Sequence, residues 1–183
     1  MHITPLLRQA ALSALLLLTP ALPSAAREVT AGERAALVET IATFDAAMRA
    51  NDMELVILSL PPKVLESMAA QFSVAVDEFV RVMAMQMKDA RGGVLFVSYG
   101  MDVNAATYAE LADGTPYAVI PTESVAQYPG RGKFKTVSST LGLIEDGHWY
   151  LLRISDGQLR LLRSLYPGFA DVAFPPGTME PVG

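Results

Sequence analysis

The sequence predicts an α+β fold, in which N-terminal helices pack on one face of a curved antiparallel sheet formed by the second half of the chain. Apolar residues recur at helical spacing up to the glycine pair at 92–93, and beyond it they alternate as in strands. Asp-Gly pairs, which are typical of tight hairpin turns, separate the apolar runs of the second half. The 183 residues are 51% hydrophobic and 18% charged, which indicates one globular domain.

The first 26 residues have the order of a secretory signal peptide. One cation, Arg8, precedes an apolar run at 10–18, which prolines and small residues follow. The run is shorter than the roughly 20 residues that span a bilayer. We therefore expect cleavage after Ala26 and a periplasmic or secreted protein without membrane insertion. The predicted regions are a signal peptide at 1–26, a single domain at 27–165 and a proline-containing tail at 166–183.

Four helical segments follow. Thr30 and Glu33 have the spacing of a capping box, so the first helix should begin at about Ala31, and Asn51 should end it. Pro62 suits the first position of a helix, and Ser73 is the expected cap of the last one. The predicted helices are 31–51, 52–58, 62–71 and 74–90.

Strands are expected in the second half, joined by turns at the Asp-Gly pairs 113–114, 146–147 and 156–157. A longer connection between the third and fourth predicted strands should contain Gly130. The tail contains prolines that exclude it from a central strand, so we expect an extended arm over the domain. The predicted strands lie near 94–101, 104–111, 116–123, 133–145, 148–154 and 158–165.

Composition excludes several classes of function. The chain has no Cys, which rules out disulfides, thiolate metal sites and cysteine nucleophiles. Its formal net charge of -5 does not favour nucleic acid, so no such partner is expected. His148 is the one histidine outside the predicted signal peptide, which excludes a multi-histidine metal site. We expect no metal and no cofactor.

The helix order and the hairpin sequence LGLIEDGHWYLL at 141–152 resemble the nuclear transport factor 2-like superfamily. The resemblance covers residues 31–165 and implies a cone with a pocket between sheet and helices. That superfamily includes ketosteroid isomerases, polyketide cyclases, dehydratases and members that only bind ligands or partners. For an isomerase-type member, it implies a carboxylate general base and a tyrosine with a second acid as oxyanion donors.

Three residues are weak catalytic candidates. Asp45 lies on the flank of the apolar stripe of the first helix, where a carboxylate either borders a pocket or is solvated. Asp102 follows a strand and precedes Asn104, a position that suits a pocket mouth or a turn. His148 starts a strand at the exposed end of a hairpin. The first helix has no tyrosine, which departs from the isomerase pattern.

Aromatic and methionine side chains are the candidates for lining a pocket. We select Tyr99, Tyr117 and Trp149 as ligand-binding candidates, because they lie on predicted strands and combine apolar surface with a polar group. Met83 and Met87 share a helix face and Met85 points away, which favours core packing over a thioether copper site.

The leading functional hypothesis is a secreted, non-catalytic binding protein that takes a small apolar ligand in the cone or a protein partner on the sheet. The alternative is a cofactor-free lyase or isomerase acting through Asp45 or Asp102, with Tyr99 as a hydrogen-bond donor. A second alternative is a structural or interaction module whose cone is filled by side chains. A homodimer through the sheet is compatible with each hypothesis.

Overall fold

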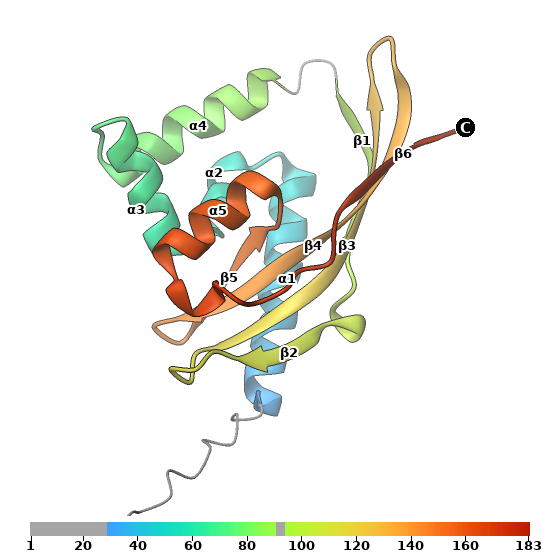
Figure 1. Cartoon of the computed structure of the whole chain (residues 1–183). Helices are drawn as coiled ribbons and strands as arrows, with labels where there is room; N and C mark the ends of the chain where they lie inside the picture. Colours follow the sequence, from blue (N-terminus) through green and yellow to red (C-terminus); the bar gives the residue numbers. More distant parts are fainter. Residues whose placement is uncertain (1–28, 91–93) are drawn as a thin grey trace, which may run out of the picture.

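The computed structural model describes residues 29–90 and 94–183. The predicted signal peptide lies outside the described residues. Figure 1 shows four helices, then a long curled antiparallel sheet, a fifth helix and a C-terminal strand. The elements are α1 (Ala31–Ala50), α2 (Met53–Leu58), α3 (Pro62–Gln71), α4 (Val76–Ala90), β1 (Leu95–Met101), η1 (Val103–Ala105), β2 (Thr107–Glu110), β3 (Pro116–Tyr128), β4 (Gly132–Glu145), β5 (His148–Arg153), α5 (Asp156–Leu165), η2 (Pro167–Phe169) and β6 (Thr178–Val182).

The predicted capping box begins α1. The Glu33 amide donates to Thr30 Oγ1 at 3.2 Å, and the Thr30 amide donates to Glu33 Oε2 at 2.8 Å, so each residue satisfies a free backbone donor of the other. Asn51 ends the helix in the left-handed conformation with φ of 55°. Pro62 is the first residue of α3, as predicted.

The start of α4 differs from the prediction. Ser73 does not cap this helix; it terminates α3 in the left-handed conformation, with φ of 56°. Its amide donates to the Ala70 carbonyl, and the Val74 amide donates to the Ala69 carbonyl, which is the Schellman pattern of a helix end. The chain then needs two more residues before Val76 begins α4.

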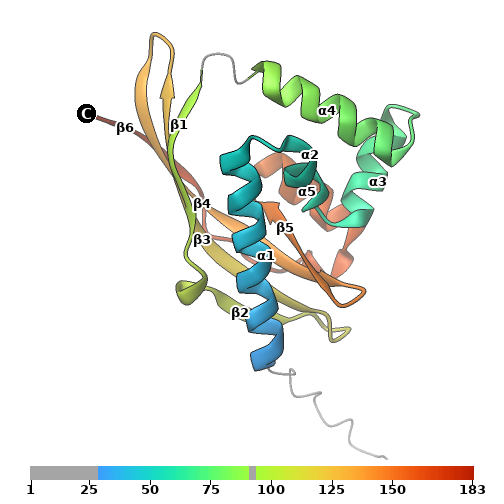
Figure 2. The same cartoon turned by 180° about the vertical axis from the view of Figure 1, so that it is seen from behind.

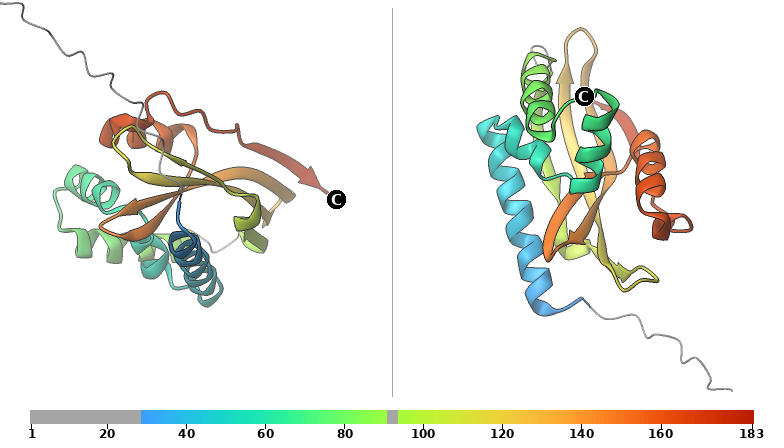
Figure 3. Two further views of the ribbon diagram at one scale, coloured as in Figure 1. Left: turned by 90° about the horizontal axis from the view of Figure 1, so that it is seen from below. Right: turned by 90° about the vertical axis from the view of Figure 1, so that its left-hand side faces the viewer.

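The sheet has the strand order β1-β3-β4-β5, and each neighbouring pair is antiparallel. Strand β2 pairs with β3 and β6 pairs with β4. Strand β3 continues beyond its predicted end at 123 to Tyr128, so a tight turn at Gly130 replaces the expected long connection. Figure 3 shows how strongly the long strands curl.

Helices cover both faces of the sheet, which corrects the expectation of one covered face. The segment predicted as a strand at 158–165 is the helix α5. Leu159, Leu162 and Tyr166 are spaced by three and four residues, so they form one apolar face, and Leu162 is fully buried. Helix α5 lies on one face and α1 on the other (Figure 3).

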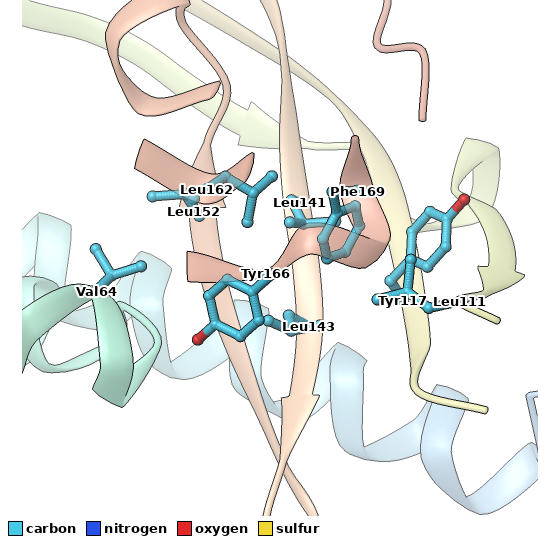
Figure 4. Packing of buried hydrophobic residues seen from close by; sticks show 9 residues of the cluster. All are labelled: Val64, Leu111, Tyr117, Leu141, Leu143, Leu152, Leu162, Tyr166 and Phe169. Carbon is cyan, nitrogen blue, oxygen red and sulfur yellow. The ribbon is translucent and has the colours of Figure 1, made fainter. Parts of the chain in front are cut away.

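The C-terminal segment is more ordered than predicted. Tyr166 and Phe169, placed in the tail by sequence, pack in the core beneath α5, as Figure 4 shows. Beyond them, β6 pairs with the edge of β4, and Pro181 is tolerated because no further strand needs its missing N–H. The expected extended arm is thus a short edge strand.

The candidate site lies on the face of the sheet that α1 covers. Trp149 and Leu151 of β5 pack with α1 on that face, and Figure 2 shows α1 crossing in front of the sheet. Helices α2, α3 and α4 form their own apolar cluster. The Leu151 amide donates to the Ser59 carbonyl at 2.7 Å, which attaches the end of α2 to the free edge of β5. Within the described ranges, no helix combines the length and apolar character of a membrane span.

Candidate functional site

A cavity of about 310 Å³ lies between the α1 face of the sheet and the four N-terminal helices. All four helices and strands β1, β3, β4 and β5 contribute side chains, and α5 adds one. Its apolar lining is Phe44, Met48, Val56, Ile57, Leu60, Met68, Phe79, Met83, Met87, Phe96, Met101 and Leu151, and its polar lining is Ser59, Tyr99, Ser124, Thr140, Arg153 and Gln158. A mainly apolar cavity with few polar groups is typical of small-molecule sites.

Methionines are prominent in this lining. Met83 and Met87 of α4 share the face that borders the cavity, and Met85 is 58% exposed on another face, as the helical spacing predicted. Met48 and Met68 reach the cavity from α1 and α3. Unbranched thioether side chains repack easily, so this wall can adapt to ligands of different shape.

A chain of hydroxyl groups begins at Tyr99 and continues into the sheet. The Tyr99 hydroxyl is hydrogen-bonded to the Thr140 side chain, and Thr140 Oγ1 lies 2.8 Å from Thr122 Oγ1. The Thr122 hydroxyl can also donate to the Ile120 carbonyl at 3.1 Å, and either threonine can be the donor between the two. Burial raises the pKa of Tyr99, partly opposed by the hydrogen bond with Thr140, and Tyr99 stays neutral at physiological pH.

Arg153 is the cation of the cavity. It lies at the end of β5, directly opposite Thr140 of β4, and its charge acts on Tyr99. The side chain is exposed to solvent and also lines the cavity, which places it at an opening. Gln158 of α5 lies at the same cavity, and its amide oxygen accepts a hydrogen bond from Ser155.

Asp45 lies beside Tyr99 but borders a different surface hollow, formed with the residues around Phe96 at the start of β1. Its Oδ1 is buried without a hydrogen-bond partner. Burial raises the pKa of the carboxyl group, partly opposed by the nearby charge of Arg49. Phe44 packs against Tyr99 with the ring centroids 5.7 Å apart and the rings tilted by 44°. Phe44 lines the main cavity, whereas Asp45 does not.

The other two catalytic candidates do not line this cavity. Asp102 accepts hydrogen bonds from the amides of Asn104 and Ala105 at 3.1 and 3.2 Å, so it caps the η1 turn. His148 is exposed at the β4–β5 turn, and its Nδ1 lies 3.0 Å from the Asp146 carbonyl. Neither residue lines the cavity.

The sheet separates Tyr117 from the other two ligand-binding candidates. Tyr99 lines the cavity, whereas Tyr117 packs edge-on against Phe169 at 5.1 Å on the opposite face. Trp149 is on the α1 face, where its Nε1 donates to the Glu33 carbonyl at 2.7 Å, and it is 5% exposed. Tyr117 and Trp149 are therefore core residues, and only Tyr99 joins the site.

A second cleft, of about 400 Å³, lies at the hairpin end of the sheet. Two of its charged groups are paired, since Lys63 Nζ lies 3.4 Å from Glu145 Oε1, and the same Nζ lies 5.1 Å from the ring centroid of Tyr166. These contacts join α3 to β4 and to the end of α5. The cleft is therefore better described as a structural junction than as a ligand site.

Sequence reasoning missed Arg153, Thr140 and Gln158. Strand parity puts Arg153 on the same face as Trp149, and this signal was available in the sequence. Thr140 became relevant only through the pairing of β4 with β3, and Gln158 only once its segment was recognised as a helix.

Comparisons of the chain with protein-family models, curated proteins and solved structures yield no match. Among the described residues, no group of three or more His, Cys, Asp or Glu side chains could hold a metal ion. The site must therefore be interpreted from its own chemistry.

Proposed function

We propose that this chain is a non-catalytic binding protein that holds a small apolar molecule in the cavity between the sheet and α1–α4. The observation that carries the proposal is the cavity itself, about 310 Å³ in volume and lined mainly by apolar side chains. Its size lies at the lower end of the range for small-molecule sites, about 300–1,000 Å³. A module with a filled cone would have no such space.

The polar groups of the cavity favour binding over catalysis. In the part of the chain that the structure describes, no carboxylate and no histidine lines it. The Thr140 and Ser59 hydroxyl groups are hydrogen-bonded within the protein, Ser59 by donating to the Val56 carbonyl at 2.6 Å. General acid–base catalysis requires a titratable group within hydrogen-bonding reach of the reacting atom. The described residues of the cavity offer only neutral Tyr99 and Arg153.

The wider context of the proposal comes from the sequence. The α+β architecture with a curled antiparallel sheet is compatible with a nuclear transport factor 2-like cone, which we propose as the fold family. The N-terminal pattern of 1–26 supports secretion to the periplasm or beyond. A protein partner on the sheet, or a second copy of the chain, would then be an additional rather than a primary ligand.

The proposal can be tested with an uncharged apolar probe. N-phenyl-1-naphthylamine fluoresces strongly in an apolar environment, and we expect saturable binding of one molecule per chain. Ser124 borders the cavity, so Ser124→Trp should fill it and abolish binding. Ser98→Trp is the matched control, because Ser98 lies on β1 but not at the cavity. Equal binding by both variants would contradict the proposal.

A cofactor-free isomerase or lyase is the second candidate, and Asp45 is the observation that favours it. A partly buried carboxyl group with an unpartnered oxygen and a raised pKa, next to Tyr99, has the properties of a general base. This function predicts that the protein exchanges the α-protons of a simple cyclic ketone with deuterium oxide. The exchange, followed by NMR, should disappear in Asp45→Asn; no exchange by the wild-type protein would count against this function.

A further inference from the structure

The charge at the cavity indicates the chemical class of its ligand, an inference that rests on the proposed binding function. Among the described residues that line the cavity, Arg153 is the only formally charged one, and no Asp or Glu accompanies it. Within residues 29–90 and 94–183, it takes part in no ion pair. The chain has a formal net charge of -5, so acidic residues outnumber basic ones. The cation at the cavity nevertheless has no acidic partner among the described residues.

Gln158, a neutral polar residue of the same lining, adds a hydrogen-bond donor to that of Arg153. The Gln158 amide oxygen is occupied by the Ser155 hydroxyl, which leaves the amide NH2 group for a ligand. A guanidinium and an amide NH2 group in the lining of one cavity match a ligand group rich in acceptor oxygens. A carboxylate is such a group, and it pairs with a guanidinium through two parallel hydrogen bonds.

The apolar wall matches an alkyl chain. Met68, Met83 and Met87 are flexible side chains, which can follow a linear chain more easily than branched residues can. Phe44 of α1 and Phe79 of α4 complete the apolar lining on this side of the cavity. A ligand in this space has its apolar part among α1–α4 and one end at Arg153.

We propose that the cavity binds a medium-chain carboxylic acid, with its carboxylate at Arg153 and its alkyl chain against the methionines of α3 and α4. The two parts of the ligand make separate predictions. The head group determines the preference for an acid over the corresponding alcohol, whereas the chain determines how affinity grows with length.

The test compares decanoate with decan-1-ol by isothermal titration calorimetry at neutral pH and low salt. We expect decanoate to bind the wild-type protein about 10- to 100-fold more tightly than decan-1-ol, the size of a charge-assisted hydrogen bond. Arg153→Gln should reduce this preference to near unity. Arg153→Lys should keep part of it, because the charge remains but the two-pronged geometry is lost. Thermal unfolding of each variant verifies that it folds.

Arg160→Gln is the matched control. Arg160 is exposed on α5, and removing it changes the net charge equally, but it does not line the cavity. We expect this variant to keep the full preference for decanoate. A loss of preference in Arg160→Gln equal to that in Arg153→Gln would overturn the proposal, because the effect would then come from net charge.

The outcomes separate this inference from the proposed function. If decan-1-ol binds as tightly as decanoate, or if Arg153→Gln binds decanoate unchanged, the anionic ligand is wrong and the apolar cavity stands. Alcohols of eight to ten carbons should gain about fourfold in affinity per methylene. If neither alcohols nor acids bind, both the ligand class and the proposed function are wrong.

Discussion

The hydroxyl oxygens of Thr122 and Thr140 lie 2.8 Å apart on neighbouring strands β3 and β4, and both residues are buried. They are diagonal neighbours, since Thr122 is opposite Ser138 and Thr140 is opposite Ile120. Thr140 is also hydrogen-bonded to Tyr99. The two threonines therefore link the Tyr99 hydroxyl at the cavity to the buried interior of the sheet. A hydroxyl without a hydrogen-bond partner there would lower the stability of the fold.

Replacement of Thr140 tests this link. Thr140→Val keeps the side-chain shape but removes the hydroxyl group that is hydrogen-bonded to Thr122 and to Tyr99, so we expect a loss of about 1–3 kcal/mol of unfolding free energy. Because the hydrogen bond with Thr140 lowers the pKa of Tyr99, its loss should raise that pKa further. Urea unfolding measures the first effect. Thr107→Val, at an exposed position of β2, is the control and should change stability little.

Gly142 provides a second test of the packing around α1. A Cβ at this position would lie 3.3 Å from Leu37 Cδ1 and from the ring of Trp149, and both neighbours are buried. We expect Gly142→Ala to cost about 1–3 kcal/mol through overpacking. Gly100→Ala on β1 is the matched control, since its added Cβ meets nothing within 4 Å. Chemical unfolding of both variants should show a loss at 142 only; equal effects would contradict the close approach.

The pH dependence of Asp45 has a definite sign. Burial raises the pKa of this carboxyl group in the folded protein above its ordinary value of 3.8. Above pH 3.8 the folded state therefore retains a proton that the unfolded state has lost. The stability contributed by this group falls as pH rises through that range. Asp45→Asn removes that penalty. We therefore expect the variant to be more stable than wild type at pH 7 and to lose this advantage at about pH 3, as measured by thermal unfolding. A variant less stable at pH 7 would argue for an unrecognised partner of the carboxylate.

The helices were largely predictable because their ends are determined by local chemistry. The Thr30 and Glu33 pair and Pro62 act within one turn, so their spacing alone locates α1 and α3. The strands β1, β4 and β5 followed from alternation and from the Asp-Gly turn at 146–147. These features need no knowledge of the rest of the chain.

The error at α5 shows where a local signal has two meanings. Asp156-Gly157 suits a hairpin turn, but it equally suits the first turn of a helix after Ser155, and the spacing of Ser155 and Gln158 is that of a capping box. Tertiary burial of Leu162 favours the helix. The same limit applies to the site. Thr140 and Arg153 lie opposite each other because of the register between β4 and β5, and the residue pattern of a single strand does not determine that register.

Deletion of β6 should have a small effect compared with a change in the core beneath α5. Residues Thr178–Val182 pair only with the edge of β4 and are mostly exposed, whereas Phe169 is fully buried against Tyr117. We expect Phe169→Ala to cost about 3–5 kcal/mol in urea unfolding. Deletion of 178–183 should cost clearly less and leave probe binding intact, because β6 does not line the cavity. Deletion exposes the edge of β4, which carries Lys133 and Lys135, and these charges discourage strand pairing between molecules. In size-exclusion chromatography the shortened protein should therefore be as monodisperse as the wild-type protein. A larger loss from the deletion than from Phe169→Ala would mean that β6, rather than the aromatic core, holds this end of the sheet.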